Sequence, residues 1–166
     1  SNEWISSASV TIERASITDP RGGNNAVKAT HNGDGSAGIV FDSVNIGEGS
    51  FPILKDQLVT FSVFVKPGSL NEVSLRFSSG DAVLTRETIN ITTGAHLSGD
   101  SLMPRVTSLA NGWYRVSVTA KAPQDFGSLN CELQLSKNGS VSINSQEHLY
   151  VFGPQAELYE ESQSLW

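Results

Sequence analysis

Cysteine and charge are both scarce in this sequence of 166 residues, and each scarcity excludes a class of structure. The one cysteine, Cys131, rules out an intramolecular disulfide, so the folded chain must be stabilised by its core. Charged residues make up 17% of the chain, too few for the Glu- and Lys-rich faces of a helical bundle. No apolar run approaches the roughly 20 residues that span a membrane, and no signal peptide is visible at the start.

Sequence signatures of catalysis are also missing. The chain has no Gly-x-Ser-x-Gly, no phosphate-binding loop, no His-Glu-x-x-His and no pair of cysteines. Cys131 lies within the alternating run 129–135, which is typical of a small core hydrophobe. Paired carboxylates need only meet in space, and Glu132 with Glu147 is the pair that could share a face. We predict no catalytic residue and no enzyme activity of its own, although a module accessory to an enzyme fits these observations.

The charge balance excludes one class of partner. The formal net charge is −6, and no basic stripe or arm is present, so we expect no nucleic-acid partner. The length fits one domain over residues 1–166. Because the chain begins at Ser1 without a methionine and ends abruptly at Trp166, we interpret it as a fragment of a larger protein.

Alternating apolar and polar residues mark eight to ten short strands with turn clusters between them. In the clearest one, Phe61, Val63 and Val65 face one way while Phe64 and Lys66 face the other. No amphipathic helix is evident, and this pattern favours an all-β, two-sheet antiparallel sandwich or jelly roll. The strand-like segments are Ala8–Ile12, Ala26–Thr30, Gly38–Phe41, Leu58–Lys66, Glu72–Phe77, Thr85–Thr92, Pro104–Leu109, Ala110–Pro123, Leu129–Ser136 and Glu147–Phe152.

Four segments in this order resemble a domain of phage tail and tail-fibre proteins and of some secreted glycan-active enzymes. They are Asp19–Thr30, Phe61–Gly68, Ala110–Ala120 and Leu149–Leu158. The resemblance covers nearly the whole chain and implies a jelly roll of the concanavalin-like superfamily, near carbohydrate-binding module families four and nine. Such modules have a convex and a concave sheet, and glycan often lies across the concave face. The ending Glu160–Trp166 departs from the family, where a Thr-Ser-Tyr-Ile-Pro type of ending is common.

Related jelly rolls often carry a structural calcium ion near the chain ends. Glu13, Asp19 and Glu157 are the imaginable ligands here. The sequence has no acidic loop with regular ligand spacing. We therefore expect no metal site and no cofactor, with structural calcium as the alternative.

If the strands pair as in the family, one outward face collects residues suited to sugar binding. A sugar needs a flat aromatic ring for its C–H side and planar polar groups for its hydroxyls. The predicted ligand-binding residues are Arg76, Trp113, Arg115, Glu132 and Gln134. A structural alternative stands beside this: Trp113 packs over the end of the sheet, and Arg115 pairs with Glu132 across strands. Trp4 and Trp166, at the chain ends, suit a sugar platform, an interface anchor or a plug over the core.

Three functions follow from the resemblance and from the missing catalytic signatures. The leading hypothesis is a non-catalytic carbohydrate-binding-like module of a phage tail fibre, tailspike or other virion protein that contacts host cell-surface polysaccharide. The second is a purely structural module that packs on neighbouring virion chains, as a homotrimer. The third is an accessory module of a secreted polysaccharide-degrading enzyme. We expect a virion or extracellular location and no membrane partner.

Overall fold

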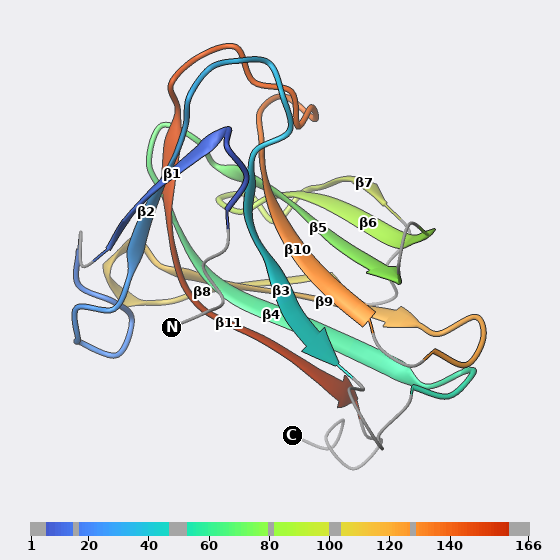
Figure 1. Ribbon diagram of the computed structural model, residues 1–166. Coiled ribbons are helices and arrows are strands. Elements are labelled where there is room, and N and C mark those ends of the chain that lie inside the picture. The colour runs from blue at the N-terminus through green and yellow to red at the C-terminus, as the bar shows by residue number, and fades with distance from the viewer. Residues whose placement is uncertain are drawn as a thin grey trace.

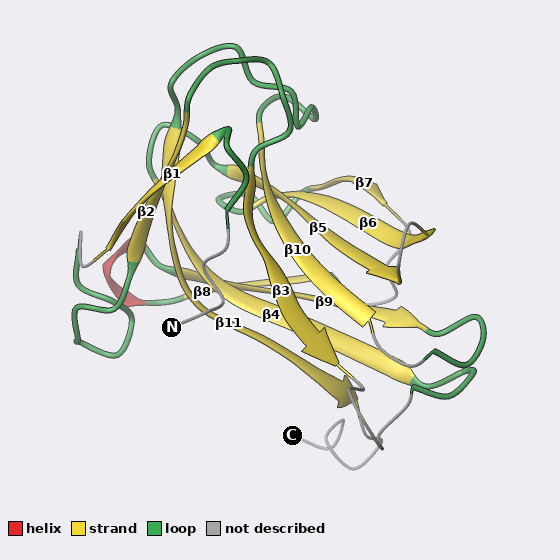
Figure 2. Cartoon of the chain, viewed as in Figure 1, coloured by secondary structure: helices red, strands yellow, loops and turns green. Residues whose placement is uncertain are grey.

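Two antiparallel β-sheets packed against each other form the fold of the computed structural model (Figure 1). The structure describes residues 6–14, 17–46, 53–79, 82–99, 104–126 and 129–159. Within these ranges the chain consists of strands and loops apart from one short 3₁₀ turn, Ala110–Gly112 (Figure 2). The predicted all-β sandwich is therefore confirmed. No helix in the described residues has the length and apolar character needed to cross a membrane.

The first sheet has six strands, and the C-terminal strand lies inside it rather than at an edge. Every neighbouring pair in this sheet is antiparallel. In spatial order the strands are β1 (Val10–Arg14), β2 (Val27–His31), β11 (His148–Tyr159), β4 (Leu58–Pro67), β9 (Tyr114–Lys121) and β8 (Arg105–Ser108).

The second sheet has five strands, and its neighbours are also antiparallel. In Figure 1, β3 of this sheet crosses in front of β4 of the first. The spatial order is β3 (Ile39–Ile46), β10 (Leu129–Ser136), β5 (Glu72–Ser79), β6 (Ala82–Asn90) and β7 (His96–Gly99).

The connections between the sheets are those of a jelly roll. Eight strands make two four-stranded layers, β2-β11-β4-β9 and β3-β10-β5-β6, and the chain changes layer at every step except the β5–β6 hairpin. This is the arrangement of two Greek keys, as the sequence predicted. Strands β1 and β8 extend the first sheet, and β7 extends the second.

The core lies between the sheets because each strand alternates apolar residues inward with polar residues outward. Phe61 of β4 inserts between Phe41 of β3 and Phe77 of β5, with ring centroids 5.6 and 6.4 Å apart in edge-to-face geometry. All three rings are fully buried. Cys131 is also fully buried, as predicted, and burial raises the pKa of its thiol.

Two features of the strands differ from the sequence prediction. There are eleven strands in the described residues instead of eight to ten, because β7 occupies a Gly- and Ser-rich stretch without a clear alternating pattern. The last strand was predicted to end at Phe152, but β11 continues to Tyr159. A β-bulge between Phe152 and Gln155 absorbs Gly153 and Pro154, and Gly153 takes the positive φ of 58° there. A Gly-Pro pair can therefore mark a bulge within a strand instead of its end.

Candidate functional site

The five predicted ligand-binding residues fall on two different sheets. Arg76 on β5 with Glu132 and Gln134 on β10 share the outer face of the second sheet. Trp113 and Arg115 belong to β9 and the turn before it, in the first sheet. The prediction of one shared face for all five is therefore wrong, since β9 is not a neighbour of β5 or β10. Trp4 and Trp166 lie outside the described residues.

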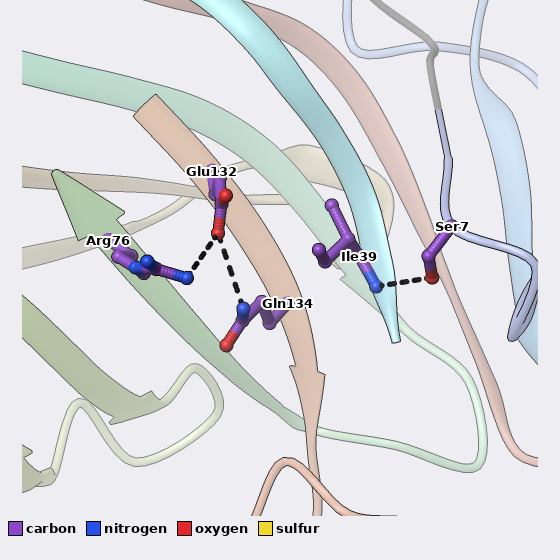
Figure 3. A network of polar contacts seen from close by, with 5 residues as sticks. All are labelled: Ser7, Ile39, Arg76, Glu132 and Gln134. Atoms are coloured by element: carbon purple, nitrogen blue, oxygen red, sulfur yellow. Dashed lines mark hydrogen bonds and ion pairs between the residues drawn. The ribbon is translucent and has the colours of Figure 1, made fainter. Parts of the chain in front are cut away.

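The three residues on the second sheet form one hydrogen-bonded cluster (Figure 3). Glu132 lies directly opposite Arg76 in the β5–β10 register, and its Oε2 accepts from Arg76 Nη1 at 3.2 Å. The same oxygen accepts from Gln134 Nε2 at 3.3 Å. The side chains of Arg76 and Glu132 are 22% and 12% exposed, and Gln134 is 2% exposed. The cluster is a rigid, nearly buried polar group on the outer face of a sheet.

Two buried atoms of this cluster have no hydrogen-bond partner in the described part of the chain. They are Arg76 Nε, which can donate, and Gln134 Oε1, which can accept. A buried polar atom without a partner costs about 1–3 kcal/mol. The cluster therefore contains one buried donor and one buried acceptor that the described residues leave unsatisfied.

The surroundings of the cluster are polar as well. Ser74 Oγ accepts from Thr88 Oγ1 at 3.4 Å, and both side chains lie on the same outer face. Glu72 Oε2 accepts from Ser136 Oγ at 3.0 Å and from the backbone N–H of Gly139 at 2.9 Å. Thr88 was not among the predicted site residues, although the inward position of its neighbour Ile89 implied that Thr88 faces outward. Glu72 was missed because its partners lie on a distant strand and turn.

Trp113 supports the fold and is closed to a ligand. It is 1% exposed, and its indole Nε1 donates to the carbonyl oxygen of Thr18 at 3.2 Å. Thr18 belongs to the loop between β1 and β2, which therefore covers the outward side of Trp113. Trp113 therefore has a packing role at the end of the sheet, and the prediction that it binds sugar is corrected. A ring enclosed in this way has no free face for a sugar.

Arg115 has different neighbours from those expected. The predicted pair with Glu132 is wrong, because Glu132 pairs with Arg76 across the second sheet. Arg115 Nη2 donates to Ser62 Oγ at 3.4 Å, and Arg115 Cζ lies 6.0 Å from the centroid of the Phe64 ring. Arg115 therefore belongs to the outer face of the first sheet, on the far side of the sandwich.

The residues considered for calcium or for acid–base chemistry are dispersed. Among the described residues, no three His, Cys, Asp or Glu side chains form a group that could hold a metal ion. Glu13 pairs with Lys28 at 3.8 Å, and Glu157 lies opposite Thr60. Glu147 bonds to Lys137 at 3.0 Å, whereas Glu132 bonds to Arg76, so each of these carboxylates has its own cation.

Asp19 organises the loop between β1 and β2. Its Oδ1 accepts from the backbone N–H groups of Arg21 at 2.8 Å and Gly23 at 3.1 Å, and its Oδ2 accepts from Asn25 at 3.1 Å. Desolvation raises the pKa of Asp19, but these three hydrogen bonds and the charge of Arg21 together lower it below the ordinary 3.8. The ionised carboxylate therefore stabilises the loop.

Replacing Asp19 by asparagine should destabilise the protein at neutral pH and much less in acid. Because the folded-state pKa lies below the unfolded one, the contribution is complete above pH about 4 and is lost as the pH falls through the folded-state pKa. Urea unfolding of the wild type and Asp19→Asn at pH 7 and pH 3 measures this. An equal difference in unfolding free energy at the two pH values would contradict the assignment.

Comparisons with known proteins place the fold but not a family. No protein-family model matches the chain, and no curated protein matches it. Among solved structures it is similar to the enzymatically active domain of tailspike protein 4 of bacteriophage CBA120, with a TM-score of 0.53 and 10% sequence identity. The match covers 95% of this chain, which spans 20% of the length of the tailspike chain. At this identity, the likeness shows that the two chains share a fold.

Proposed function

We propose that this chain is a non-catalytic glycan-binding module of a phage tail protein and that it contacts host cell-surface polysaccharide. The single observation that carries the proposal is the pair of buried atoms without partners, Arg76 Nε and Gln134 Oε1, within the polar outer face of the second sheet. The fold likeness to a phage tailspike domain, together with the resemblance of four sequence segments to phage tail domains, supports the setting.

The chemistry of the face suits a polyhydroxylated ligand. A sugar hydroxyl can donate to an acceptor such as Gln134 Oε1 or accept from a donor such as Arg76 Nε, so a polyhydroxylated ligand carries the groups that both atoms lack. Glu132 already holds Arg76 and Gln134 in place through hydrogen bonds, which limits the conformational entropy lost on binding. The Ser74 and Thr88 hydroxyls beside the cluster are buried and bonded to each other, so they keep the surroundings of Arg76 and Gln134 polar.

Replacing Gln134 by alanine should weaken glycan binding about tenfold or more, because it removes the acceptor and loosens Glu132. A glycan array of bacterial surface polysaccharides identifies the ligand, and titration calorimetry then compares the variants. Gln124→Ala is the matched control, because Gln124 is an exposed amide in the loop after β9 with no hydrogen bond among the described residues. The control should bind as the wild type does.

Two outcomes would contradict the proposal. One is equal affinity of wild type and Gln134→Ala for every glycan that binds. The other is an absence of response to any polysaccharide on the array. If the protein binds no polysaccharide and self-associates in solution, a structural role in the virion explains the results better. Release of reducing ends from a polysaccharide by this chain alone would overturn its non-catalytic assignment.

A further inference from the structure

The outer face of the first sheet gathers basic side chains that form no ion pair within the described residues, although the charge of Arg21 also acts on Asp19. Lys66 and Arg115 lie on β4 and β9, Arg105 lies on β8 opposite Ser117, and Arg21 projects from the loop after β1. None of the four makes an ion pair in the described residues, whereas Lys28, Arg76, Lys121 and Lys137 each do. Since the whole chain carries a formal charge of −6, this concentration of cations runs against its overall charge.

Two phenylalanine rings lie between two of these cations. Arg21 Cζ is 5.8 Å from the Phe152 centroid, the Phe152 and Phe64 centroids are 5.8 Å apart, and Arg115 Cζ is 6.0 Å from the Phe64 centroid. These four side chains form a row that crosses β11, β4 and β9, and both phenylalanine rings are half-buried. We call Arg21, Lys66, Arg105, Arg115, Phe64 and Phe152 the cationic face.

The fold holds these cations in place. Arg21 follows Asp19, whose carboxylate accepts the Arg21 backbone N–H, and the neighbouring Thr18 carbonyl accepts from Trp113 Nε1. On the other side, Arg115 donates to Ser62. Of these hydrogen bonds only the one from Arg115 Nη2 uses a guanidinium donor, and both arginine side chains are exposed.

Hydroxyl groups continue the face along β4 and β9. Beyond Ser62, the Thr60 and Thr119 hydroxyls bond to each other at 2.9 Å, and Ser117 lies opposite Ser62. The combination of separated cations and half-buried apolar rings matches a polymer that carries carboxylates and apolar C–H faces, whereas the Ser62 and Thr119 hydroxyls are buried and bond within the sheet. It matches nucleic acid poorly, because duplex DNA has one negative charge per ~1.7 Å, a higher charge density than these few separated cations can neutralise.

We propose that the cationic face binds an acidic polysaccharide, with uronate carboxylates on Arg21 and Arg115 and sugar rings against Phe64 and Phe152. This site lies on the opposite side of the sandwich from the Arg76–Glu132–Gln134 cluster and does not depend on it. The cationic face prefers an acidic polysaccharide to a neutral one, because guanidinium and carboxylate groups form charge-assisted hydrogen bonds. The interaction is partly exposed, so salt should weaken it as the screening length shortens to about 8 Å at physiological ionic strength.

The test compares three acidic polymers, one neutral polymer and two double variants. The ligands are polygalacturonate, alginate and hyaluronate, with methyl-esterified polygalacturonate as the neutral counterpart of the first. The Arg21→Gln/Arg115→Gln variant should bind the acidic polymers at least about tenfold more weakly, since the loss of two partly exposed contacts amounts to about one power of ten. Arg14→Gln/Lys55→Gln removes the same charge from exposed positions elsewhere and should bind as the wild type does.

Several results would overturn the proposal. They are the absence of wild-type binding to all three acidic polymers, equal binding of the methyl ester, or equal losses in the two double variants. Binding to poly-glutamate in place of the polysaccharides would make an acidic protein segment the occupant and would also overturn it. Gln134→Ala separates the two sites: it should leave uronate binding unchanged, so the cationic face can fail or succeed independently of the polar cluster.

Discussion

Replacing Phe61 by alanine should lower the free energy of unfolding by about 3–5 kcal/mol, one of the two largest effects expected for this protein. Phe61 is the ring through which the first sheet contacts two phenylalanines of the second, Phe41 and Phe77. Its removal leaves a cavity between the layers and also ends both edge-to-face contacts. Strands on either side cannot close this gap without disturbing their hydrogen-bonded registers.

Urea unfolding followed by circular dichroism measures the effect. Phe64→Ala is the matched control, because Phe64 lies on the same strand three residues later but on the outer face and only half-buried. We expect its cost to be clearly smaller, since less apolar area returns to water. Equal losses from the two variants would contradict the inward orientation of Phe61.

Trp113→Ala should be similarly costly, at about 3–5 kcal/mol, although Trp113 lies outside the inter-sheet core. The side chain is almost fully enclosed, and its indole N–H holds the loop at Thr18. Trp113→Phe keeps most of the packing but leaves the Thr18 carbonyl without its donor, so about 1 kcal/mol is the expected loss. Thermal and urea unfolding of the two variants separate packing from hydrogen bonding.

The same pair of variants decides between the two interpretations of Trp113. If its ring supports the loop, Trp113→Phe should bind neutral glycans as tightly as the wild type does. A large loss of neutral-glycan affinity with little loss of stability would restore Trp113 as a ligand contact. Uronate binding provides a second measure, because loosening the Thr18 attachment also frees Arg21 from its position beside Phe152.

The strand pattern and the core could be predicted from the sequence because they depend on local alternation. The inward positions of Phe61, Val63 and Val65 follow from the period of two, and all three are fully buried. The dipeptide Asn138-Gly139 is a strong hairpin signal, and Lys137 and Ser140 do bond across it with φ of 53° and 81° at the two central residues. Such signals need only a few neighbouring residues.

The grouping of the candidate site could not be predicted, because it depends on which strands become neighbours. Outward positions were correctly assigned to Arg76, Glu132 and Arg115, yet only the first two share a sheet. Alternation gives the face of a residue within its own sheet and says nothing about which sheet that is. The cationic face was missed for a related reason: Arg21 reaches it from a loop, and Phe152 reaches it beside a Gly-Pro bulge that obscured the strand.

The place of β11 between β2 and β4 sets an order of events during synthesis. Thr30 pairs with His148, which is more than one hundred residues later, so the first sheet stays divided until β11 has left the ribosome. Until then β2 and β4 each present an open edge, and open edges invite pairing with other chains. Contacts between such distant residues also form slowly. Nascent chains that stall before β11 should therefore be the species that chaperones must shield.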